Sequence, residues 1–595
     1  MTENDKSPLE SKEYAVPHAR YQACWKAAMP VLITIPLILA LVFFVIDFRD
    51  QYMLPVPEKA DLLDSSATDA GSGRNVEFFL HPENHVSRTQ DVLHFSWNIS
   101  KATITPDGVN KEAFLVNNQF PGPTIEARPG DILEINILNS AQDDLSVHWH
   151  GLHMRGSYHL SILVACSKTN TEAQVVDRGK SDGWARWFNT MSYQARYKLH
   201  LSSPHWKSVR HILGIGITGR LQKSWLRFKT EQAWELNLSQ PAPDSLLVNG
   251  LGHFDCSKVR QNDPVQCRWA EPPRFSLNNE LRYRVRLVNV GSMSGISLTV
   301  PDADLEVFQV DGGLPVATSH TANSIGVLYP GERVDFILSW TDSTSSMELQ
   351  IEIELDRELF LWPNPALSRI QSFALTIDSP ELQPNIANGN DLRRFNLGEA
   401  KGNSLDSPLP EPQTFYMIYT NVQVINQLDD EARGLVNRTI WEPQSLPLIS
   451  LDRESWNDHQ LVPWTGPEPV WVELTINNVD KNGHPFHLHG HDVYVVASYE
   501  GKNGNNAYNP FDTMPPHGGQ FNLVDPIRKD TVYVPPSGYV VLRFLADNEG
   551  IWALHCHVLW HSASGMAMAL QVLGDGQKGF SESKDGIDAM ENCSA

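Results

Sequence analysis

The residues with the most evident chemistry lie near the C-terminus, in the stretch HCHVLWH at 555–561, followed by Met566. On a β-strand, His555 and His557 share one face and Cys556 takes the other. One thiolate, two imidazoles and a weak thioether are the ligands of a blue-copper electron-transfer site. Cys556 and His561 supply two of these ligands, and Met566 is the candidate axial one. His555 and His557 are then free to bind metal on the opposite side.

A second stretch, HPFHLHGH at 484–491, precedes the first by about seventy residues. The ordered pair HPxHLHG and HCHxxxHxxxGM resembles the C-terminal copper-binding motifs of the multicopper oxidases, the family of laccases, ascorbate oxidases and ferroxidases. The resemblance implies a blue copper held by His484, Cys556 and His561 with Met566 axial, a type 2 copper on His487, a type 3 pair on His489, His555 and His557, and electron transfer through His484, Cys556, His555 and His557. His491 matches no ligand, so we expect it to be structural or solvated.

The strand and turn before the second stretch occur twice. DILEINILNSAQDDLSVHWHGLHM begins at 131, and VWVELTINNVDKNGHPFHLHGHDV begins at 470. Two copies of one strand–turn–HxHG unit predict tandem related domains. The first copy resembles the family's first copper motif, which implies that His148 binds the type 2 copper and His150 one type 3 copper. The string FPGPTIEARPGD at 120–131 also resembles the family's first domain.

The remaining pattern after residue 85 is typical of β-structure. Apolar and polar residues alternate at 133–137, 283–287, 351–355 and 472–476, which predicts strands with one buried face. Gly, Pro and Asn punctuate these runs at short intervals. With the resemblance, the expected fold is all-β: three tandem cupredoxin-like Greek-key β-sandwich domains, the first disrupted, with one N-terminal transmembrane helix.

The segment 158–240 departs from the family. A family member is expected to carry a second His-x-His motif here, together with an acidic residue for proton delivery, but no such motif occurs. Residues 158–230 hold twelve Lys and Arg against three Asp and Glu, although the whole chain has a net charge of −23. We expect a translated intron, a shifted reading frame or a degenerated region, poorly ordered. A polyanion-binding insert is the alternative.

The N-terminal region contains an apolar run from Met29 to Ile46, which just reaches the length needed to span a bilayer. The 28-residue head and the lack of a small-x-small cleavage site favour an uncleaved signal anchor over a long signal peptide. Basic residues before the run place the N-terminus in the cytosol. The catalytic domains are then expected to be extracellular or lumenal on a single-pass membrane protein, or else secreted.

Composition limits the partners and the number of domains. The chain has 595 residues, 41% hydrophobic content and pI near 5.4, which predicts three or four domains and argues against nucleic acid as a partner. Sequons at Asn98, Asn237, Asn437 and Asn592 are compatible with a glycoprotein. The expected domains are a cytosolic tail 1–28, an anchor 29–48, a stalk 49–84, domain 1 at 85–157, the aberrant segment 158–240, domain 2 at 241–384, a linker 385–412, domain 3 at 413–575 and a tail 576–595.

The middle domain resembles a family domain that binds no copper and helps to shape the substrate site. Its strings DSLLVNG at 244–250 and LEVFQVDG at 305–312 carry the resemblance. Cys256 and Cys267 could pair across a loop, although the family's usual partner could instead fall in the aberrant segment. In the third domain, the strings PIRKDTVYVPP at 526–536 and ADNEG at 546–550 also match.

The resemblance implies a laccase-like copper oxidoreductase, a membrane-attached monomer that oxidises small phenolic substrates by one electron and reduces O₂ to water by four. In fungal members such enzymes act in lignin breakdown, pigment formation or secondary metabolism. A ferroxidase is the alternative, and it requires acidic residues near His484 and His561 that the sequence alone does not place. Only six of the eight expected trinuclear histidines can be assigned, so a catalytically impaired copper-binding protein is a third possibility.

Overall fold

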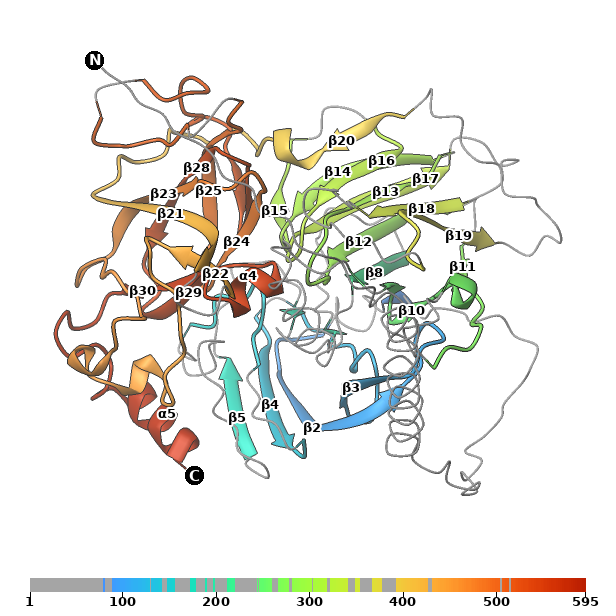
Figure 1. Ribbon diagram of the computed structural model, residues 1–595, viewed down its shortest axis with the longest axis horizontal. Helices are drawn as coiled ribbons and strands as arrows, with labels where there is room; N and C mark the ends of the chain where they lie inside the picture. The colour runs from blue at the N-terminus through green and yellow to red at the C-terminus, as the bar shows by residue number, and fades with distance from the viewer. Residues whose placement is uncertain are drawn as a thin grey trace, which may run out of the picture. The chain divides into compact units, whose positions relative to one another are not determined.

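The alternating runs fold into β-strands, as the sequence predicts. In β4 (Ile132–Asn139) buried residues alternate with partly exposed ones along the whole strand. In β14 (Ala303–Val310) the same period of two continues until the last residue. These two strands therefore present one apolar face to a core, and the chain packs such faces against one another in layered sheets (Figure 1).

The computed structural model describes residues 79–80 and 88–594, and the strands at 172–177, 188–189, 196–197 and 211–219 by their backbone only. The gaps within 88–594 are 129, 142–146, 156–171, 178–187, 190–195, 198–210, 220–242, 244, 259–265, 278–280, 302, 318–320, 341–347, 354–365, 377–391, 426–430, 503–505 and 513–514. Among the described residues, no helix is long and apolar enough to cross a bilayer. The predicted anchor at 29–48 lies outside them.

The described part of the first domain contains one four-stranded sheet. Its order is β3 (Lys111–Val116), β2 (Val92–Ile104), β4 and β5 (Glu172–Asp177). A separate pair joins β6 (Phe188–Asn189) to β7 (Arg196–Tyr197). The strands β5, β6 and β7 belong to the segment 158–240 that departs from the family.

The middle domain is a sandwich of two sheets around its own apolar core. The first sheet has the order β10 (Leu251–Gly252), β9 (Leu246–Val248), β8 (His211–Gly219), β12 (Tyr283–Asn289), β17 (Arg333–Trp340), β14 and β15 (Leu314–Pro315), with β1 (Phe79–Leu80) also on β8. The second has the order β11 (Phe275–Ser276), β19 (Ile370–Thr376), β18 (Glu348–Ile353), β13 (Ile296–Thr299), β16 (Ser324–Leu328) and β20 (Arg394–Asn396). Short helices η2 (Cys256–Lys258) and η3 (Leu397–Glu399) lie in its loops.

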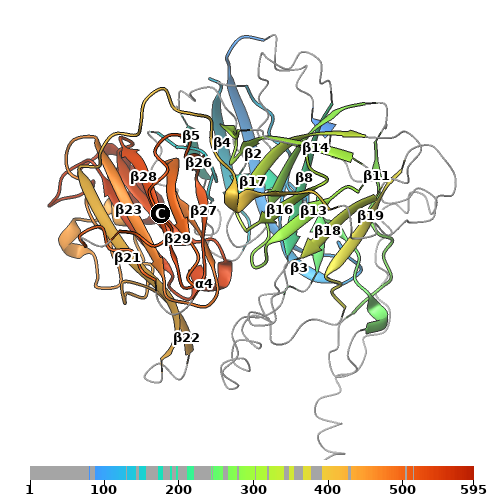
Figure 2. The same ribbon diagram turned by 90° about the horizontal axis from the view of Figure 1, so that it is seen from above.

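The third domain is also a two-sheet sandwich, whose sheets lie side by side in both views (Figure 1 and Figure 2). The first sheet has the order β22 (Glu431–Val436), β21 (Thr414–Ile425), β23 (Val470–Asn478), β28 (Tyr539–Ala546), β25 (Val493–Tyr499) and β26 (Ile527–Lys529). The second has the order β27 (Thr531–Val534), β24 (His484–Leu488), β29 (Gly550–Cys556) and β30 (Ala567–Val572). The helices among its described residues are α4 (Leu559–Ala563), α5 (Lys584–Ser594), η5 (Leu448–Ser450) and η6 (Arg453–Ser455).

One pairing pattern recurs in all three domains. In each, a first strand pairs antiparallel with the strand that follows it and parallel with a later one, which in turn pairs antiparallel with a fourth. The three sets are β3-β2-β4-β5, β9-β8-β12-β17 and β22-β21-β23-β28. The sequence repeat predicted this relation for the two outer domains alone, and the topology extends it to the middle one.

The strand β8 is notable because it lies inside the segment 158–240. Its backbone pairs with β12 over seven residues, from Tyr283↔His211 to Asn289↔Ile217. It therefore occupies the first-strand position of the middle domain, ahead of the predicted domain start at 241. The predicted boundaries and the predicted disorder of this segment otherwise stay predictions.

The expectation of one exposed face is wrong for β12 and for β23, whose residues at 283–287 and 472–476 are all buried. Arg284 and Arg286 were expected to face solvent, but both are buried. Arg284 donates to Asp335 of the neighbouring β17 at 2.5 Å and to Gln309 at 2.9 Å. Charged residues can occupy a covered face when an opposite charge and hydrogen bonds accompany them. The loop cysteines Cys256 and Cys267 form a disulfide, as one of the two open possibilities predicted.

Candidate metal centres

The pairing of β24 with β29 brings both histidine-rich motifs together. Phe486 lies opposite Cys556, and His487 lies opposite His555. The strand β29 ends at Cys556, and the one-turn helix α4 then carries His561 back toward the cysteine. The strands β24 and β29, together with α4, therefore place histidine and cysteine side chains on both sides of one strand pair.

On one side, His484, Cys556 and His561 form a group that could hold a metal ion. The Nδ1 atoms of the two histidines are 3.1 Å apart. The Cys556 Sγ lies 3.6 Å from His561 Nδ1 and 3.9 Å from His484 Nδ1. All three side chains are buried, so one thiolate and two imidazole nitrogens converge in a dry pocket. This is the ligand set that favours a blue-copper centre.

The carboxylate of Asp480 selects the metal-facing nitrogen of His484. Its Oδ2 lies 2.8 Å from His484 Nε2, and it also accepts the main-chain N–H of Val422 at 2.8 Å. A carboxylate accepts, so Nε2 carries the proton and Nδ1 is left free to face Cys556. Asp480 is the acidic residue near His484 that the sequence analysis did not place, and its side chain is 18% exposed.

Met566 lies on the same side, directly after the turn that follows α4. It is fully buried, its main-chain N–H donates to His561 O at 2.9 Å, and its carbonyl accepts the N–H of Cys556 at 3.1 Å. A Cβ at Gly434 would come within 2.7 Å of the Met566 Cβ, so the strand β22 packs tightly against it. The backbone thus holds the candidate axial residue beside two of the candidate ligands.

On the other side, six histidines from three motifs converge. The Nε2 atoms of His148 and His487 are 3.3 Å apart, and those of His489 and His555 are 3.1 Å apart. The rings of His150 and His557 have centroids 5.0 Å apart. The resemblance implies type 2 roles for His148 and His487 and type 3 roles for the other four histidines, and the structure groups them in these pairs. His148, His150 and His487 also form a group that could hold a metal ion.

Main-chain carbonyls select the facing nitrogens in two of these rings. His487 Nδ1 donates to the carbonyl of Asp530 at 2.8 Å, and His555 Nδ1 donates to the carbonyl of Cys556 at 2.9 Å. In the neutral rings, Nε2 is then an unprotonated acceptor aimed into the cluster. Within the described part of the chain, the Nδ1 atoms of His148, His150 and His489 and both ring nitrogens of His557 have no hydrogen-bond partner.

Burial keeps these imidazoles neutral. Removal from water, reinforced by the neighbouring rings, holds the pKa of His148, His489 and His557 well below the ordinary value. Burial also lowers the pKa of His555 to about 3. Neutral imidazoles are the metal-binding form, whereas burial raises the pKa of the Cys556 thiol, so metal must displace its proton. A dry cluster of neutral imidazoles fits metal ions well, because several of its nitrogens have no hydrogen-bond partner among the described residues.

His491 takes no part in either cluster. It is buried, donates from Nδ1 to the carbonyl of His489 at 3.1 Å and packs on Trp552. Burial lowers its pKa to about 4. It is therefore structural, which was one of its two expected roles.

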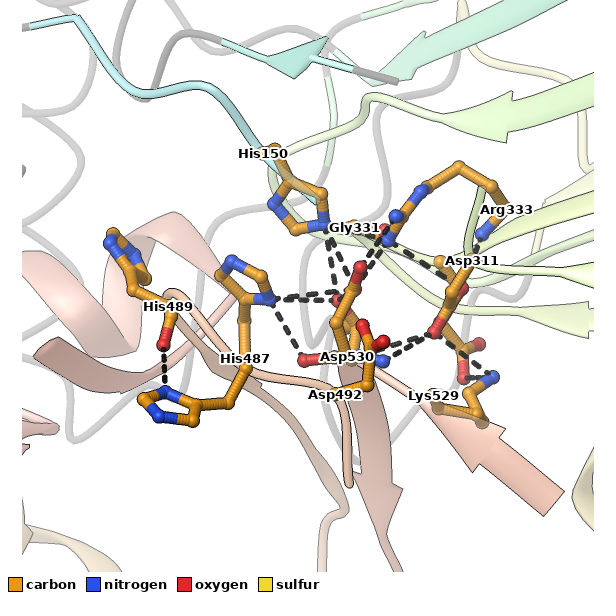
Figure 3. Close-up of polar contacts among 12 residues, drawn as sticks. His150, Asp311, Gly331, Arg333, His487, His489, Asp492, Lys529 and Asp530 are labelled. Carbon is orange, nitrogen blue, oxygen red and sulfur yellow. Dashed lines mark hydrogen bonds and ion pairs between the residues drawn. The ribbon is translucent and has the colours of Figure 1, made fainter. Parts of the chain in front are cut away.

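Several charged residues around the six histidines were not singled out in the sequence. Arg333 of the middle domain lies 2.9 Å from His150 Nε2, and Asp530 contacts both Arg333 and His487 (Figure 3). Asp530 and its partner Asp311 lie inside strings that resemble the family, but charged residues at strand ends usually face solvent. A buried arginine needs a carboxylate partner. An arginine in an apolar strand of the sequence is therefore the signal that could have indicated these aspartates.

Comparison with known proteins places the chain among relatives of one kind. Three family models described as "Multicopper oxidase" match residues 98–160, 221–346 and 434–575. The second match begins inside the segment 158–240, so the resemblance resumes earlier than the sequence pattern indicated. Residues 161–220 lie between the first and second matches.

Laccase-1 of Cryptococcus neoformans var. grubii is 24% identical over 541 residues, covering 85% of this chain and 84% of that protein. The crystal structure of Fet3p, a multicopper oxidase that functions in iron import, has a TM-score of 0.69 at 17% identity, covering 85% of this chain and 95% of that one. The crystal structure of the laccase from Botrytis aclada has a TM-score of 0.65 at 23% identity, covering 86% of this chain and 92% of that one. These two structures share the fold.

Removal of metal is expected to destabilise the protein. Without ions, the six-histidine cluster buries neutral imidazole nitrogens that have no hydrogen-bond partner within the described part of the chain, which costs free energy. An ion present at one hundred times its Kd stabilises the folded state by about 2.7 kcal/mol. Thermal unfolding should therefore begin several degrees lower after exhaustive chelation and recover when copper is returned. Equal unfolding temperatures with and without copper would show that the clusters bind none.

Proposed function

Because the chain belongs to the multicopper oxidase family, whose cofactor is copper, we propose that it is a laccase-like oxidase. It would remove one electron at a time from small phenolic substrates and reduce O₂ to water with four electrons. The observation that carries the proposal is the trio of His484, Cys556 and His561, with its thiolate between two imidazole nitrogens. The similarity to fungal laccases favours phenols as the substrates.

The residue roles follow from the two clusters. His484, Cys556 and His561 would hold the blue copper, with Met566 axial. His148 and His487 would hold the type 2 copper, and the pairs His489–His555 and His150–His557 one type 3 copper each. Bound copper supplies one-electron redox chemistry, and the chain supplies a dry, preorganised set of neutral ligands. Cys556 is covalently joined to His555 and His557, so one strand end connects the two centres.

Oxygen reduction is the demanding half of this proposal. Each type 3 pair has two histidines among the described residues, and the His-x-His motif expected to supply a third to each pair does not occur in the sequence of 158–240. Loss of ligands lowers metal affinity or activity by roughly 10–100-fold or more. A copper-binding protein without turnover is therefore the outcome to set against the laccase.

The location of the enzyme belongs to the same proposal. We infer that residues 29–48 anchor a monomer in a membrane and hold the copper-binding domains on the extracellular or lumenal side. The apolar run from Met29 to Ile46 is what supports this placement. Fractionation of cells into membrane and soluble protein, with and without residues 1–48, would test it.

Ferroxidase activity is a second candidate that one contact favours. The carboxylate of Asp480 is partly exposed and hydrogen-bonds the candidate blue-copper ligand His484. An anion at this position would attract a divalent cation such as Fe²⁺. The electron of the cation would then pass through the His484 ring. The structural similarity to Fet3p is compatible with this interpretation.

Oxygen consumption by the purified full-length protein tests the proposed function. A laccase should consume O₂ faster with an electron-rich phenol than with Fe²⁺, at matched concentrations and with copper loaded. Faster consumption with Fe²⁺ would replace the laccase by the ferroxidase. Absence of consumption with either substrate, despite bound copper, would leave only the copper-binding protein.

Substitution of Asp480 should separate the two substrates. In Asp480→Asn the amide oxygen can still accept from His484 Nε2, but the negative charge is lost. If Fe²⁺ is the substrate, kcat/KM for Fe²⁺ should fall roughly tenfold or more, because the negative charge that attracts the cation is lost. The phenol value should change little. Glu582→Gln, an exposed substitution in the tail, is the control, and equal losses for both substrates would contradict a specific role in iron oxidation.

Substitution of Met566 should change the reduction potential of the blue copper. In Met566→Leu the side-chain volume is nearly conserved, so the leucine should fill the buried position without leaving a cavity. A thioether lowers the potential relative to an aliphatic side chain, so the variant should have a higher reduction potential and retain its blue absorption. Redox titration of the blue band measures both. A bleached variant would contradict a purely tuning role.

A further inference from the structure

Arg333 links the copper-free middle domain to the candidate trinuclear site. It is the first residue of β17, and its side chain is completely buried. Its guanidinium binds both carboxylate oxygens of Asp530 in the third domain, at 2.5 and 2.6 Å. The same Nη1 lies 2.9 Å from Nε2 of His150 in the first domain. One side chain therefore contacts both of the domains that supply the histidines (Figure 3).

Asp530 acts on two candidate copper ligands. Its main-chain carbonyl accepts the Nδ1–H of His487 at 2.8 Å. Its Oδ1 accepts from the Thr531 hydroxyl at 2.9 Å, and that hydroxyl oxygen lies 3.2 Å from His150 Nε2. Arg333 Nη1 and the Thr531 hydroxyl therefore both contact Nε2 of His150. Nδ1 of the same ring has no hydrogen-bond partner among the described residues, so it is the nitrogen left to face the cluster.

Asp311 hydrogen-bonds the main chain of both Arg333 and Asp530 and so fixes their relative positions. Its Oδ1 accepts the main-chain N–H of Arg333 at 3.1 Å. Its Oδ2 accepts the main-chain N–H groups of Asp530 and Thr531, at 3.1 and 3.2 Å. The loop between β26 and β27 is therefore tied to the middle domain by its backbone as well as by its charge.

Electrostatics favour the ionised form of this network. Burial alone would raise the pKa of Asp530, but the charge and hydrogen bonds of Arg333 hold it well below the ordinary value. Lys529 and Glu332 form a second buried ion pair between the same domains at 2.7 Å. Removal of one member of a buried pair is strongly destabilising because its partner is left charged and unpaired.

The backbone beside Arg333 constrains a further histidine. Gly331 has a φ of 87°, and a Cβ built there would lie 2.6 Å from Cδ2 of His557. The carbonyl of Gly331 also accepts from Arg333 Nη1 at 3.1 Å. The same turn of the middle domain thus braces the His557 ring and carries the arginine.

We propose that Arg333, together with Asp530 and Asp311, is a positioning device for the trinuclear copper site. It fixes which ring nitrogen His150 and His487 present to copper, so the domain that binds no copper determines the geometry of the site. The inference rests on the proposed function, because it takes these histidines as copper ligands. Arg333 acts through Asp530 and Thr531 and need not touch copper or oxygen itself.

The test compares Arg333→Gln and Arg333→Lys in the full chain with Arg284→Gln as a matched control. Arg284 is also buried and pairs with Asp335 on the same sheet, and among the described residues it makes no hydrogen bond or ion pair with Asp530 or the candidate copper ligands. Arg333→Gln should lose type 2 copper, with roughly a 10–100-fold lower affinity. Arg333→Lys keeps the charge without the two-pronged contact, so its loss should be intermediate.

The readouts are electron paramagnetic resonance of type 2 copper and copper content per chain. The blue absorption should persist in all variants and reports that the third domain is folded. Type 2 signal and copper content in both Arg333 variants equal to those of Arg284→Gln would overturn the inference while leaving the proposed function intact. Wild-type protein without any type 2 copper would overturn both. If Arg333→Gln fails to fold, Arg333→Lys alone decides.

Discussion

The register between β24 and β29 is the constraint on which the rest of the structure depends. With His487 opposite His555 and Phe486 opposite Cys556, imidazoles gather on one side of the strand pair and the thiol lies on the other. A slip of one residue would exchange the faces and separate both ligand sets. The register is held by the buried neighbours Phe486, Leu488 and Leu554, and by pairing of β24 with β27 and of β29 with β30 on the outer sides.

A second constraint is the way in which three domains share the candidate trinuclear site. The first domain supplies His148 and His150, the third supplies the other four histidines, and the middle domain supplies the charged contacts behind them. The apolar core is continuous between the outer domains, with Trp97 and Trp149 in the same cluster as Phe486 and Trp552. Apolar contacts hold domains together but do not specify ring orientation, whereas hydrogen bonds to carboxylates and carbonyls do. Copper ligation therefore requires both kinds of contact.

The sequence allowed the convergence of the candidate ligands to be predicted, but not their supporting contacts. Within HPFHLHG and HCHVLWH, the spacing of histidines along strands determines which face each one occupies, so local pattern sufficed. Asp480 is only four residues from His484, yet an aspartate in a polar turn is usually solvated. Arg333 and Asp530 are 197 residues apart and meet only in the folded chain. The arginines of β12 depart from the pattern for a related reason: alternation of apolar and charged residues predicts an exposed face, whereas Asp335 accompanies these arginines inside.

The fold was predictable where its signal repeats. The strand–turn–HxHG unit showed the relation of the outer domains, whereas β8 belongs to a stretch whose charge and alternation did not resemble a strand of this fold.

Crystals of the copper-loaded protein, measured at the copper absorption edge, test the central claim most directly. The account predicts one anomalous peak among His484, Cys556 and His561, and further peaks among the six histidines on the other side of β29. A peak at neither place, or copper bound only elsewhere, would contradict it.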